Sequence, residues 1–341
     1  MRVGAFVLAA QFPGQGQGEA LHRAVRTAET AEESGLDSVW LAEHHFVPYG
    51  VCPSAVTLAG LLLGRTRHIR VGTAVSVLPN AHPVALGEQA ALLHLLSEGR
   101  FSLGVGRGGP WVDLEVFGAG LEAYEHDFPE SLGLLLRWLR EPRVAATGDR
   151  FVFREVPVVP RPDELLDQEG PEVIVACTSP KSVKLAALHA LPMLLGMHCD
   201  DEEKAGMVAL WRAHAHAAGH SQETVAAVRH VSVGVAQIAD DTAEATETLL
   251  KAMPGWLRQG LGAHTTVDGR QRAMRDPVAY TELLCALHPV GPPELAADRL
   301  AATSERTGIT RFALLVEGSG DLVATEENVR RLGSEVLPRL G

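Results

Sequence analysis

The feature that most constrains this chain is a regular alternation between short apolar runs and amphipathic segments. Near-continuous apolar strands separated by amphipathic helices are typical of a parallel sheet that helices cover on its outside. Eight runs read as strands: 3–8, 38–42, 69–77, 101–106, 173–176, 192–195, 231–238 and 312–316. Eight is the number that a closed (β/α)8 barrel requires, so we predict an α/β fold of the TIM-barrel class with insertions.

The length of the chain fits one such barrel. Its 341 residues exceed the usual single compact core, but barrels with insertions run to about 250 residues or more, so we expect one domain over 1–341. Alternating apolar residues predict a hairpin-like insert at about 145–162. The stretch at about 260–290 is polar and irregular, which favours a lid-like or mobile segment.

Charge and composition exclude several classes of partner. The formal net charge of -12 argues against nucleic acid or an anionic membrane, because both need a concentrated basic surface. A small-molecule substrate fits better. No apolar stretch approaches the roughly 18 residues that span a bilayer, and no signal-like segment opens the chain, so we expect a cytoplasmic protein. The four cysteines lack C-x-x-C spacing, which predicts free thiols and no metal site.

Polar residues follow the second apolar run, at the strand end where barrel enzymes gather catalytic side chains. Glu43, His44 and His45 stand there. Adjacent side chains on an extended segment point in opposite directions, so the two histidines cannot share one role. The alternative is that they only hydrogen-bond across the mouth. Glu43, as a lone acidic group, would need a partner if buried. His82 precedes Pro83 and is interpreted as ordering a turn before a helix.

Two further strand ends indicate an anion site. Arg107 follows the fourth strand, and its planar fork suits an oxyanion held by two parallel bonds. Cys177, Thr178, Ser179 and Lys181 follow the fifth strand, with a capping hydroxyl and a proline that would open a helix whose first amides point at an anion. The alternative for this second segment is an ordinary capped helix.

The predicted helices at about 54–64 and 83–96 are apolar on nearly every side. An outer helix of a lone barrel should expose a polar face to water, so the excess apolar surface predicts a homodimer through these helices. The alternative is that the inserted loops cover them.

Several runs together resemble the bacterial luciferase-like flavin-dependent monooxygenases, and the luciferase alpha subunits most. The resemblance covers nearly the whole chain, and the combination is far more specific than any one run. The runs are WLAEHHF at 40–46, VGTAV at 71–75, LPNAHPV at 78–84, SEGRF at 97–101 with Arg107-Gly108 after it, HPVGP at 288–292 and EVLP at 335–338.

The resemblance implies an enzyme that takes up reduced FMN (FMNH2) from a separate flavin reductase and uses O2 as co-substrate. A flavin C4a-hydroperoxide would form in a closed barrel mouth and oxygenate a small organic substrate. The protein would position the cofactor, exclude water and supply a proton donor or acceptor. Because the 260–293 stretch looks shorter than the luciferase lid, we expect a specialised metabolite as substrate instead of a long-chain aldehyde.

The resemblance also assigns site residues. His44 matches the catalytic histidine, an acid or base near the flavin, and Glu43 would lie beside the flavin pocket. Arg107 matches an arginine on the flavin phosphate. Thr73, Ala74 and Val75 would pass under the flavin ring, with a cis peptide bond between Ala74 and Val75.

The phosphate site after the fifth strand departs from the family pattern. Related luciferases have an acidic residue and then serine where this chain has Cys177 and Thr178, and a hydroxyl residue where it has Lys181. Cys177, Thr178, Ser179 and Lys181 are still predicted to bind the cofactor, and the lysine should strengthen phosphate binding, but the hydrogen bonds need not be those of the family.

Two other functions remain open from the sequence. One is a deazaflavin-dependent hydride-transfer oxidoreductase, which shares the barrel and a strand-end histidine; the run around Arg107 favours the monooxygenase. The other is a non-catalytic flavin-binding protein or an inactive subunit of a heterodimer, against which the presence of His44 and Arg107 argues.

Overall fold

The chain forms a closed barrel of parallel strands. The computed structural model describes residues 1–163, 170–270 and 275–341. Its main sheet has the order β3-β2-β1-β13-β10-β9-β8-β5-β4, and a further pairing of β3 with β5 closes it. The strands are β1 (Arg2–Val7), β2 (Ser38–Leu41), β3 (Arg70–Thr73), β4 (Ser76–Val77), β5 (Phe101–Gly106), β8 (Glu172–Cys177), β9 (Met193–Leu195), β10 (Val231–Val235) and β13 (Arg311–Leu315). Since β3 and β4 are two parts of one barrel strand, the predicted (β/α)8 barrel is confirmed.

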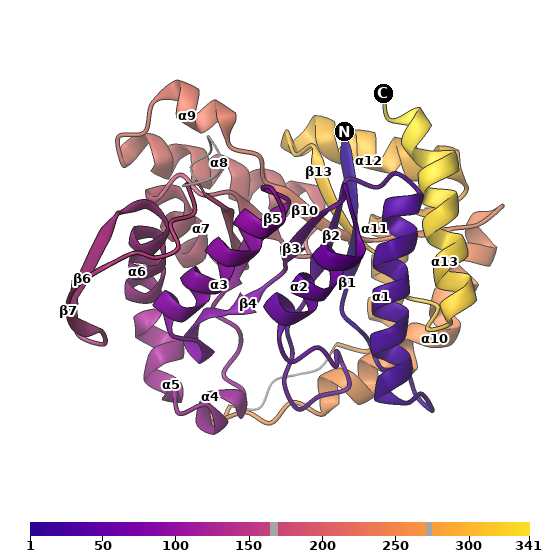
Figure 1. Cartoon of the computed structure of the whole chain (residues 1–341). Helices are drawn as coiled ribbons and strands as arrows, with labels where there is room; N and C mark the ends of the chain where they lie inside the picture. The colour runs from indigo at the N-terminus through magenta and orange to yellow at the C-terminus, as the bar shows by residue number, and fades with distance from the viewer. Residues whose placement is uncertain (164–169, 271–274) are drawn as a thin grey trace.

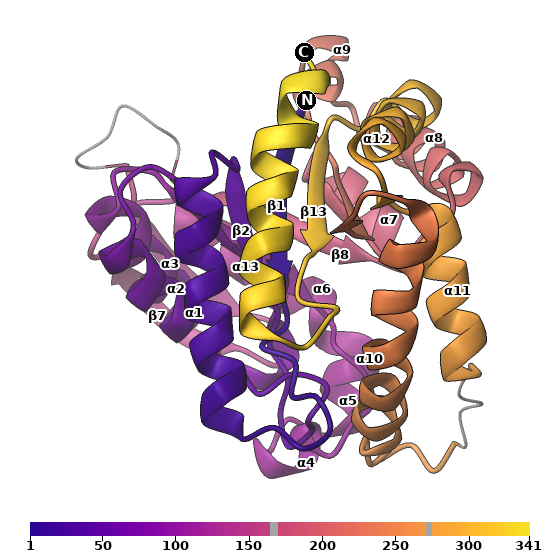
Figure 2. The ribbon, with the colours of Figure 1, turned by 90° about the vertical axis from the view of Figure 1, so that its right-hand side faces the viewer.

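Helices surround the strands on the outside of the barrel (Figure 1). The main ones are α1 (Gln17–Glu33), α2 (Ala55–Arg65), α3 (Pro83–Leu96), α6 (Phe128–Arg140), α7 (Pro180–Leu188), α8 (Asp201–Ala217), α10 (Thr242–Gly262), α11 (Pro277–Leu287), α12 (Pro293–Thr307) and α13 (Leu322–Arg331). Shorter elements are η1 (Leu78–Asn80), α4 (Asp113–Val116), α5 (Gly120–Glu122), η2 (Ala123–Asp127), α9 (Gln222–Ala227), β11 (Gln237–Ile238), β12 (Val290–Gly291), η3 (Leu332–Val336) and η4 (Leu337–Arg339). The first and last helices, α1 and α13, pack side by side next to β1, and both chain termini lie at one end of the barrel (Figure 2).

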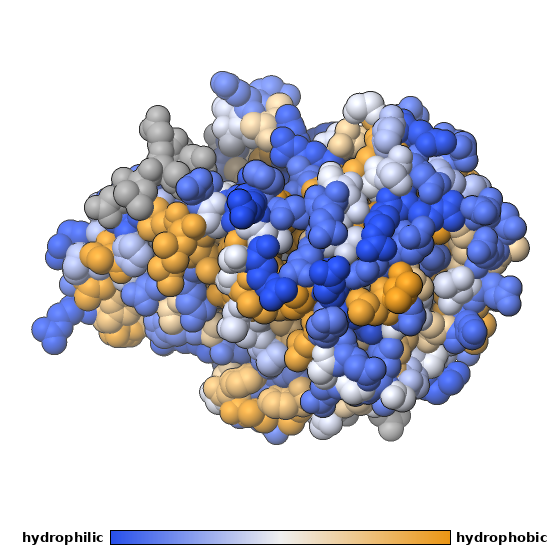
Figure 3. All heavy atoms as spheres, turned by 45° about the vertical axis from the view of Figure 1, so that its right-hand side comes forward, coloured by the Kyte–Doolittle hydropathy of each residue, from blue (hydrophilic) through white to orange (hydrophobic). Residues whose placement is uncertain are grey.

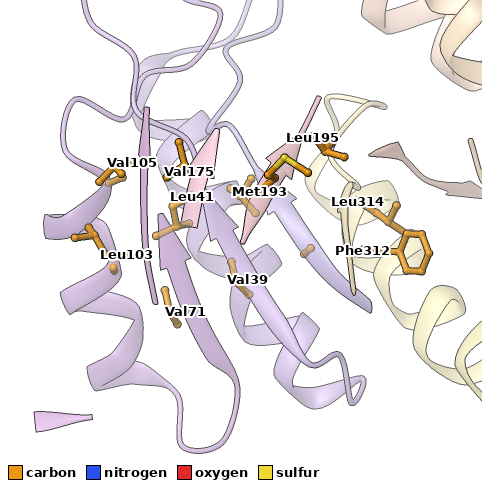
Figure 4. Packing of buried hydrophobic residues seen from close by; sticks show 14 of the residues in the cluster. Val39, Leu41, Val71, Leu103, Val105, Val175, Met193, Leu195, Phe312 and Leu314 are labelled. Carbon is orange, nitrogen blue, oxygen red and sulfur yellow. The ribbon is translucent and has the colours of Figure 1, made fainter. Parts of the chain in front are cut away.

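Strand residues alternate between two apolar clusters. Val39 and Leu41 point outward into the layer between barrel and helices, whereas Trp40 between them packs inside the barrel. Figure 4 shows side chains of that outer layer carried by neighbouring strands, among them Val71 and Val105. Both faces of each strand are therefore buried, which explains why the runs are apolar without interruption.

Polar caps set where several helices begin. Several N-cap side chains accept a hydrogen bond from a backbone N–H in the first turn of the helix that they precede, and such a cap contributes about 1 kcal/mol. Those with a serine or aspartate at this position include Ser54, Ser179, Asp200, Ser221, Asp241, Asp276 and Asp321.

An antiparallel hairpin stands beside the barrel where the insert at about 145–162 was expected. Its strands, β6 (Arg143–Thr147) and β7 (Val152–Pro157), pair with each other. Its apolar residues form a small cluster with Trp138 of α6 and Val84 of α3. The hairpin thus covers the start of α3 and leaves much of its outer face uncovered.

The stretch at about 260–290 is more regular than its composition indicates. Helix α10 continues to Gly262, and α11 and β12 occupy most of the stretch from Pro277 onward; residues 271–274 lie outside the described part. The expectation of an irregular segment was wrong for α11, because Asp276 caps its start and Thr281, Leu284 and Cys285 face the core along one side of the helix. The lid role itself stays a prediction.

Three other sequence expectations concern the surface and the cysteines. Among the helices of the described residues, none combines the length and apolar character needed to cross a membrane. All four cysteines are free thiols and buried. The outer faces of α2 and α3 keep Leu61, Leu92 and Leu96 exposed, at 50%, 49% and 76%, and Figure 3 shows apolar patches at the surface of this side of the molecule.

Candidate functional site

The predicted site residues come together at the end of the barrel to which the strands point. His44 follows β2 and Arg107 follows β5, and both strands pair with β3. Two inter-strand spacings, or about 10 Å, separate β2 from β5. Helices α4 and α5 lie at this end, opposite the chain termini (Figures 1 and 2). One barrel mouth therefore serves both residues.

A pocket of about 230 Å³ opens beside Arg107. It gathers five of the predicted cofactor residues from three separate strand ends, together with residues of η2, α6 and α7. The predicted members are Val75, Arg107, Thr178, Ser179 and Lys181, and the others include Gly106, Gly108, Glu125, Phe128 and Ser182.

Arg107 presents a guanidinium that no acid neutralises. It stacks on the ring of Tyr124, 4.1 Å from the ring centroid, and no carboxylate of the described chain pairs with it. Stacking fixes the plane of the group and leaves its donors at the edge, which is the geometry for a bidentate contact to an oxyanion. The site thus holds one oriented and uncompensated cation.

The start of α7 supplies the opposite wall. The Ser179 hydroxyl caps the helix by accepting a hydrogen bond from the Ser182 backbone N–H, and Pro180 takes the first helical position. The predicted cap is confirmed. Lys181 donates from Nζ to the backbone carbonyl of Glu125 at 3.3 Å, which anchors its charge at the pocket rim. The positive end of the helix dipole and a lysine together attract an anion.

Glu125 is an unfavourable neighbour for an anion. Glu125 is a lining residue of the same pocket, and its carboxylate lies 3.7 Å from the His126 ring. A carboxylate in this position repels an incoming negative group, so the pocket's attraction for anions depends on Arg107 and Lys181 outweighing it.

Cys177 does not reach this pocket, contrary to the predicted role. Its side chain packs in the layer between barrel and helices together with Val173 and Val175, and its thiol lies 3.5 Å from the Val175 carbonyl oxygen. The physical reason is strand alternation: Ala176 faces inward and lines the pocket, so Cys177 faces outward. Burial raises the pKa of this thiol to about 12, which keeps it protonated.

Thr73 and Gly106 shape the barrel wall from within. The Thr73 hydroxyl donates to the Gly104 carbonyl at 2.6 Å and accepts from the Gly104 N–H at 3.0 Å, so its side chain is occupied by β5. A Cβ on Gly106 would meet Val75 Cγ2 at 2.5 Å. The glycine therefore makes room for the Val75 side chain.

Glu43 holds the barrel mouth together. Its Oε1 accepts from the Val77 N–H at 2.9 Å, and its Oε2 accepts from the Ala55 N–H at 3.1 Å. Backbone N–H groups of β4 and α2 thus supply the hydrogen-bond partners that this carboxylate needs. Glu43 is absent from the lining of the pocket at Arg107, and its predicted contact with the cofactor stays a prediction.

The segment between β3 and β4 joins the two halves of the mouth. The peptide bond between Ala74 and Val75 is cis, as predicted from the resemblance. Val75 lines the pocket on one side and packs on the other against the inner cluster, to which Tyr49 also belongs. Val75 therefore belongs both to the pocket at Arg107 and to the inner apolar cluster that Tyr49 also contacts.

His44 lies in an apolar setting. Its ring contacts Tyr49 edge-on, with centroids 5.0 Å apart, and its buried Nδ1 has no hydrogen-bond partner within residues 1–163, 170–270 and 275–341. Burial first, and then the nearby His264 and His45, lower the pKa of His44 to about 3. At neutral pH the imidazole is uncharged and can accept a proton or a hydrogen bond.

An aromatic group surrounds His44. Tyr49 stacks on Trp256 with centroids 4.8 Å apart, and Trp256 stacks in turn on Phe12 at 5.5 Å. His264 contacts Trp111 at 4.6 Å and Tyr49 at 6.3 Å. These rings come from four distant parts of the chain and give the mouth an apolar, water-excluding wall.

The loop after α10 closes over this group. The Val112 N–H donates to the Thr265 carbonyl at 2.9 Å, and the Val267 N–H donates to the Pro110 carbonyl at 3.0 Å. His264 stands on this tied loop. The described beginning of the predicted lid-like segment therefore lies against the loop after β5.

The other two histidines have different surroundings. His45 contacts Phe117 at 4.8 Å and lies 3.7 Å from the Glu43 carboxylate, so it faces the rim and not the Tyr49 side. The expectation that adjacent histidines differ in role agrees with this arrangement. His82 caps α3 by accepting from the Val84 N–H at 3.2 Å, which confirms its structural role.

Sequence reasoning missed several residues of the site. The clearest are Tyr124 beneath Arg107, Ser182 in the cap of α7, and Tyr49, Trp256 and His264 near His44. Ser182 stands three residues after a capping serine, a spacing that could have identified it. The aromatic residues carry no local signal, because only the closed barrel brings them together. Among the described residues, no group of His, Cys, Asp and Glu is placed to hold a metal ion.

Comparisons with known proteins agree with this geometry. A family model described as luciferase-like monooxygenase matches residues 1–311. The alkanal monooxygenase alpha chain of Photorhabdus luminescens is 28% identical over 357 aligned positions, which cover 100% of this chain and 98% of the relative.

Solved structures share the fold. Monooxygenase RslO1 from Streptomyces bottropensis superposes with a TM-score of 0.84 at 23% identity and covers 100% of both chains. The oxygenating constituent of 3,6-diketocamphane monooxygenase from Pseudomonas putida, solved with FMN, gives 0.79 at 19% identity, covering 100% and 99%. An F420-dependent secondary alcohol dehydrogenase gives 0.76 at 18% identity, covering 100% and 99%. At these identities the superpositions establish the fold alone.

Proposed function

This chain belongs to the luciferase-like monooxygenase family, and from that premise we propose that it is an enzyme that uses reduced FMN and O2 to oxygenate a small organic substrate. One observation carries the proposal. Arg107 and His44 stand at the same end of the barrel, and Val75 lines the pocket at Arg107 while it packs on the inner apolar cluster. Arg107 has no carboxylate partner among the described residues and lies beside the start of α7, whereas the neutral His44 lies in an apolar wall. The first suits a phosphate and the second suits proton transfer.

The pocket residues fit the phosphate end of FMN. Arg107 and Lys181 would hold the phosphate as cations, and the Thr178 hydroxyl would offer a further donor at the start of α7, where the Thr178 and Ser179 amides already donate to the Ser182 hydroxyl. A pocket of about 230 Å³ accommodates this end of the cofactor, and the ring would extend over Val75 towards His44. When bound, reduced FMN supplies the two electrons that let one oxygen atom of O2 enter the substrate while the other leaves as water.

His44 would act as the proton acceptor at the reacting centre. Its neutral form prevails at physiological pH because burial lowers its pKa to about 3. The buried Nδ1 is closed to solvent, so the half-buried ring would meet a polar group of the cofactor or substrate through Nε2. Tyr49 and Trp256 exclude water around it, which strengthens each polar interaction made there.

The same proposal implies particular partners. A separate flavin reductase would deliver FMNH2, since the pocket gathers contacts for a phosphate and ring and the described residues build a single barrel. The exposed Leu61, Leu92 and Leu96 on α2 and α3 support a homodimer, because the hairpin packs elsewhere and does not cover them. A cytoplasmic location and a specialised metabolite as substrate complete the proposal.

Rapid mixing tests the reaction class. The protein is loaded with reduced FMN without oxygen and mixed with aerated buffer while absorbance is followed. We expect a species absorbing in the near ultraviolet to persist for seconds before oxidised FMN forms, and the His44→Ala variant to shorten its lifetime. Oxidised FMN appearing as fast as in protein-free buffer would contradict the proposal.

The same experiment, carried out with reduced F420 as well as reduced FMN, separates the two other functions. A deazaflavin hydride-transfer enzyme would bind reduced F420 more tightly than reduced FMN and turn over without oxygen. A non-catalytic binding protein would bind FMN yet give the same reoxidation rate in wild type and His44→Ala.

A further inference from the structure

A second cavity lies at the opposite end of the barrel. It encloses about 860 Å³ and has no residue in common with the pocket at Arg107. Arg2, Arg70, Glu172 and Arg311 line it, and each is the first residue of its strand, in β1, β3, β8 and β13. Because parallel strands begin at one end, these residues ring the N-terminal mouth of the barrel, on the side of the chain termini in Figure 1.

The lining of this cavity is strongly basic. Its charged side chains other than histidine are five arginines and one carboxylate: Arg2, Arg70, Arg140, Arg229, Arg311 and Glu172. Arg311 neutralises Glu172 through two bonds of 2.7 and 3.0 Å. In a chain with a net charge of -12, this concentration of positive charge is a local feature.

Most of the remaining arginines lack acidic partners. Arg70 reaches only the Ser102 hydroxyl, at 3.5 Å, and Arg229 donates only to backbone carbonyls. Neither they nor Arg140 pair with a carboxylate anywhere in residues 1–163, 170–270 and 275–341. Arg2 is 3.7 Å from Asp37, but its side chain is 66% exposed, so that pair contributes little. Within the part of the chain that the structure describes, three guanidinium groups without a carboxylate partner thus line one cavity.

His94 of α3 also lines the cavity, and its side chain is only 2% exposed. Neither ring nitrogen has a hydrogen-bond partner within the described chain, and both are closed to solvent. Buried polar side chains are normally paired, and leaving one unpaired costs about 1–3 kcal/mol. His94 is therefore an unsatisfied polar group in the cavity wall, and its ring can report on an anion bound among the arginines.

We propose that this N-terminal cavity binds a compact, multivalent oxyanion, carried by phosphate or carboxylate groups. Barrel residues at this end ordinarily serve stability, but a purely structural cluster would pair its charges, whereas this one leaves them open. The cavity is concave and the chain is acidic overall, which favours a small anion over a nucleic acid. The site is separate from the proposed oxygenation chemistry and does not depend on it.

Calorimetric titration at physiological ionic strength tests the proposal. The probes are inorganic pyrophosphate and, separately, citrate. The diagnostic variant is Arg140→Gln combined with Arg229→Gln, because both side chains are exposed and their loss leaves the core intact. Arg154→Gln is the matched control: Arg154 is equally exposed, on the β7 hairpin, outside the cavity. Lys181→Gln reports binding at the other, catalytic-side pocket.

We expect pyrophosphate to bind the N-terminal cavity of the wild type, the double variant to bind it there at least about tenfold more weakly, and Arg154→Gln and Lys181→Gln to keep the wild-type affinity at this cavity. Citrate binding with the same dependence extends the ligand class to carboxylates; pyrophosphate binding alone restricts it to phosphates. Imidazole ¹⁵N resonances of His94 should shift on binding. No binding of either anion, or binding lost in Lys181→Gln but kept in the double variant, overturns the proposal.

Discussion

Replacing Arg107 by glutamine is the most informative perturbation of the candidate cofactor pocket. Arg107 stacks on Tyr124 and has no carboxylate partner in the described chain, so its charge is available to a ligand. Two charge-assisted hydrogen bonds to a phosphate, made by a half-buried group, contribute about 2–3 kcal/mol. At about 1.4 kcal/mol per factor of ten, Arg107→Gln should weaken FMN binding roughly 30- to 150-fold.

Riboflavin provides the control within the same assay, because it carries the ring and lacks the phosphate. Dissociation constants for FMN and riboflavin are measured by fluorescence quenching for wild type, Arg107→Gln and Arg107→Lys. We expect riboflavin binding to be the same in all three proteins, and FMN binding to Arg107→Lys to be intermediate, since lysine keeps the charge and loses the planar fork. Equal loss for both ligands would mean that Arg107 supports the ring site or the fold, and the reasoning would be refuted.

Four further substitutions test other parts of the molecule. Glu125→Gln removes a negative charge at a lining residue of the pocket and keeps the backbone carbonyl that accepts from Lys181. FMN binding should therefore tighten roughly threefold in the fluorescence titration, and weaker binding would contradict this. His44→Ala should lower turnover at least about 100-fold, and the wild-type rate should not fall near pH 6.5, because the pKa of His44 is about 3. Burial also lowers the pKa of His288 to about 3, so this histidine is protonated in the unfolded chain at a higher pH than in the folded one. At about pH 5 this difference lowers the free energy of unfolding by roughly 2 kcal/mol. His288→Asn should remove this part of the acid sensitivity, which urea unfolding at several pH values measures. Glu317→Gln keeps an acceptor for the Leu8 N–H but leaves the buried Arg23 uncompensated, so the free energy of unfolding should drop by about 3 kcal/mol; an unchanged urea midpoint would show that the pair is neutral.

The sequence predicted the barrel well because its strands are buried on both faces and so are apolar throughout. It also placed His44, Arg107 and the capped start of α7 at strand ends, where the topology brings them together. Strand alternation could have assigned Cys177 to the outer layer, since Val173 and Val175 share its face.

Contacts between residues far apart in the chain could not be predicted from the sequence. Nothing near Glu43 indicates that its carboxylate would hold the backbone of Val77 and Ala55. Tyr49, Trp256 and His264 become neighbours only when the last barrel units close against the first. Such contacts depend on the closed geometry and not on any local pattern.

A crystal structure with bound FMN tests the central claim most directly, namely that one barrel mouth holds both the anion pocket and His44. We predict the phosphate between Arg107 and the first turn of α7, and the ring over Val75 on the side of His44. A phosphate bound instead among the arginines of the N-terminal cavity, or a ring remote from His44, would contradict the account.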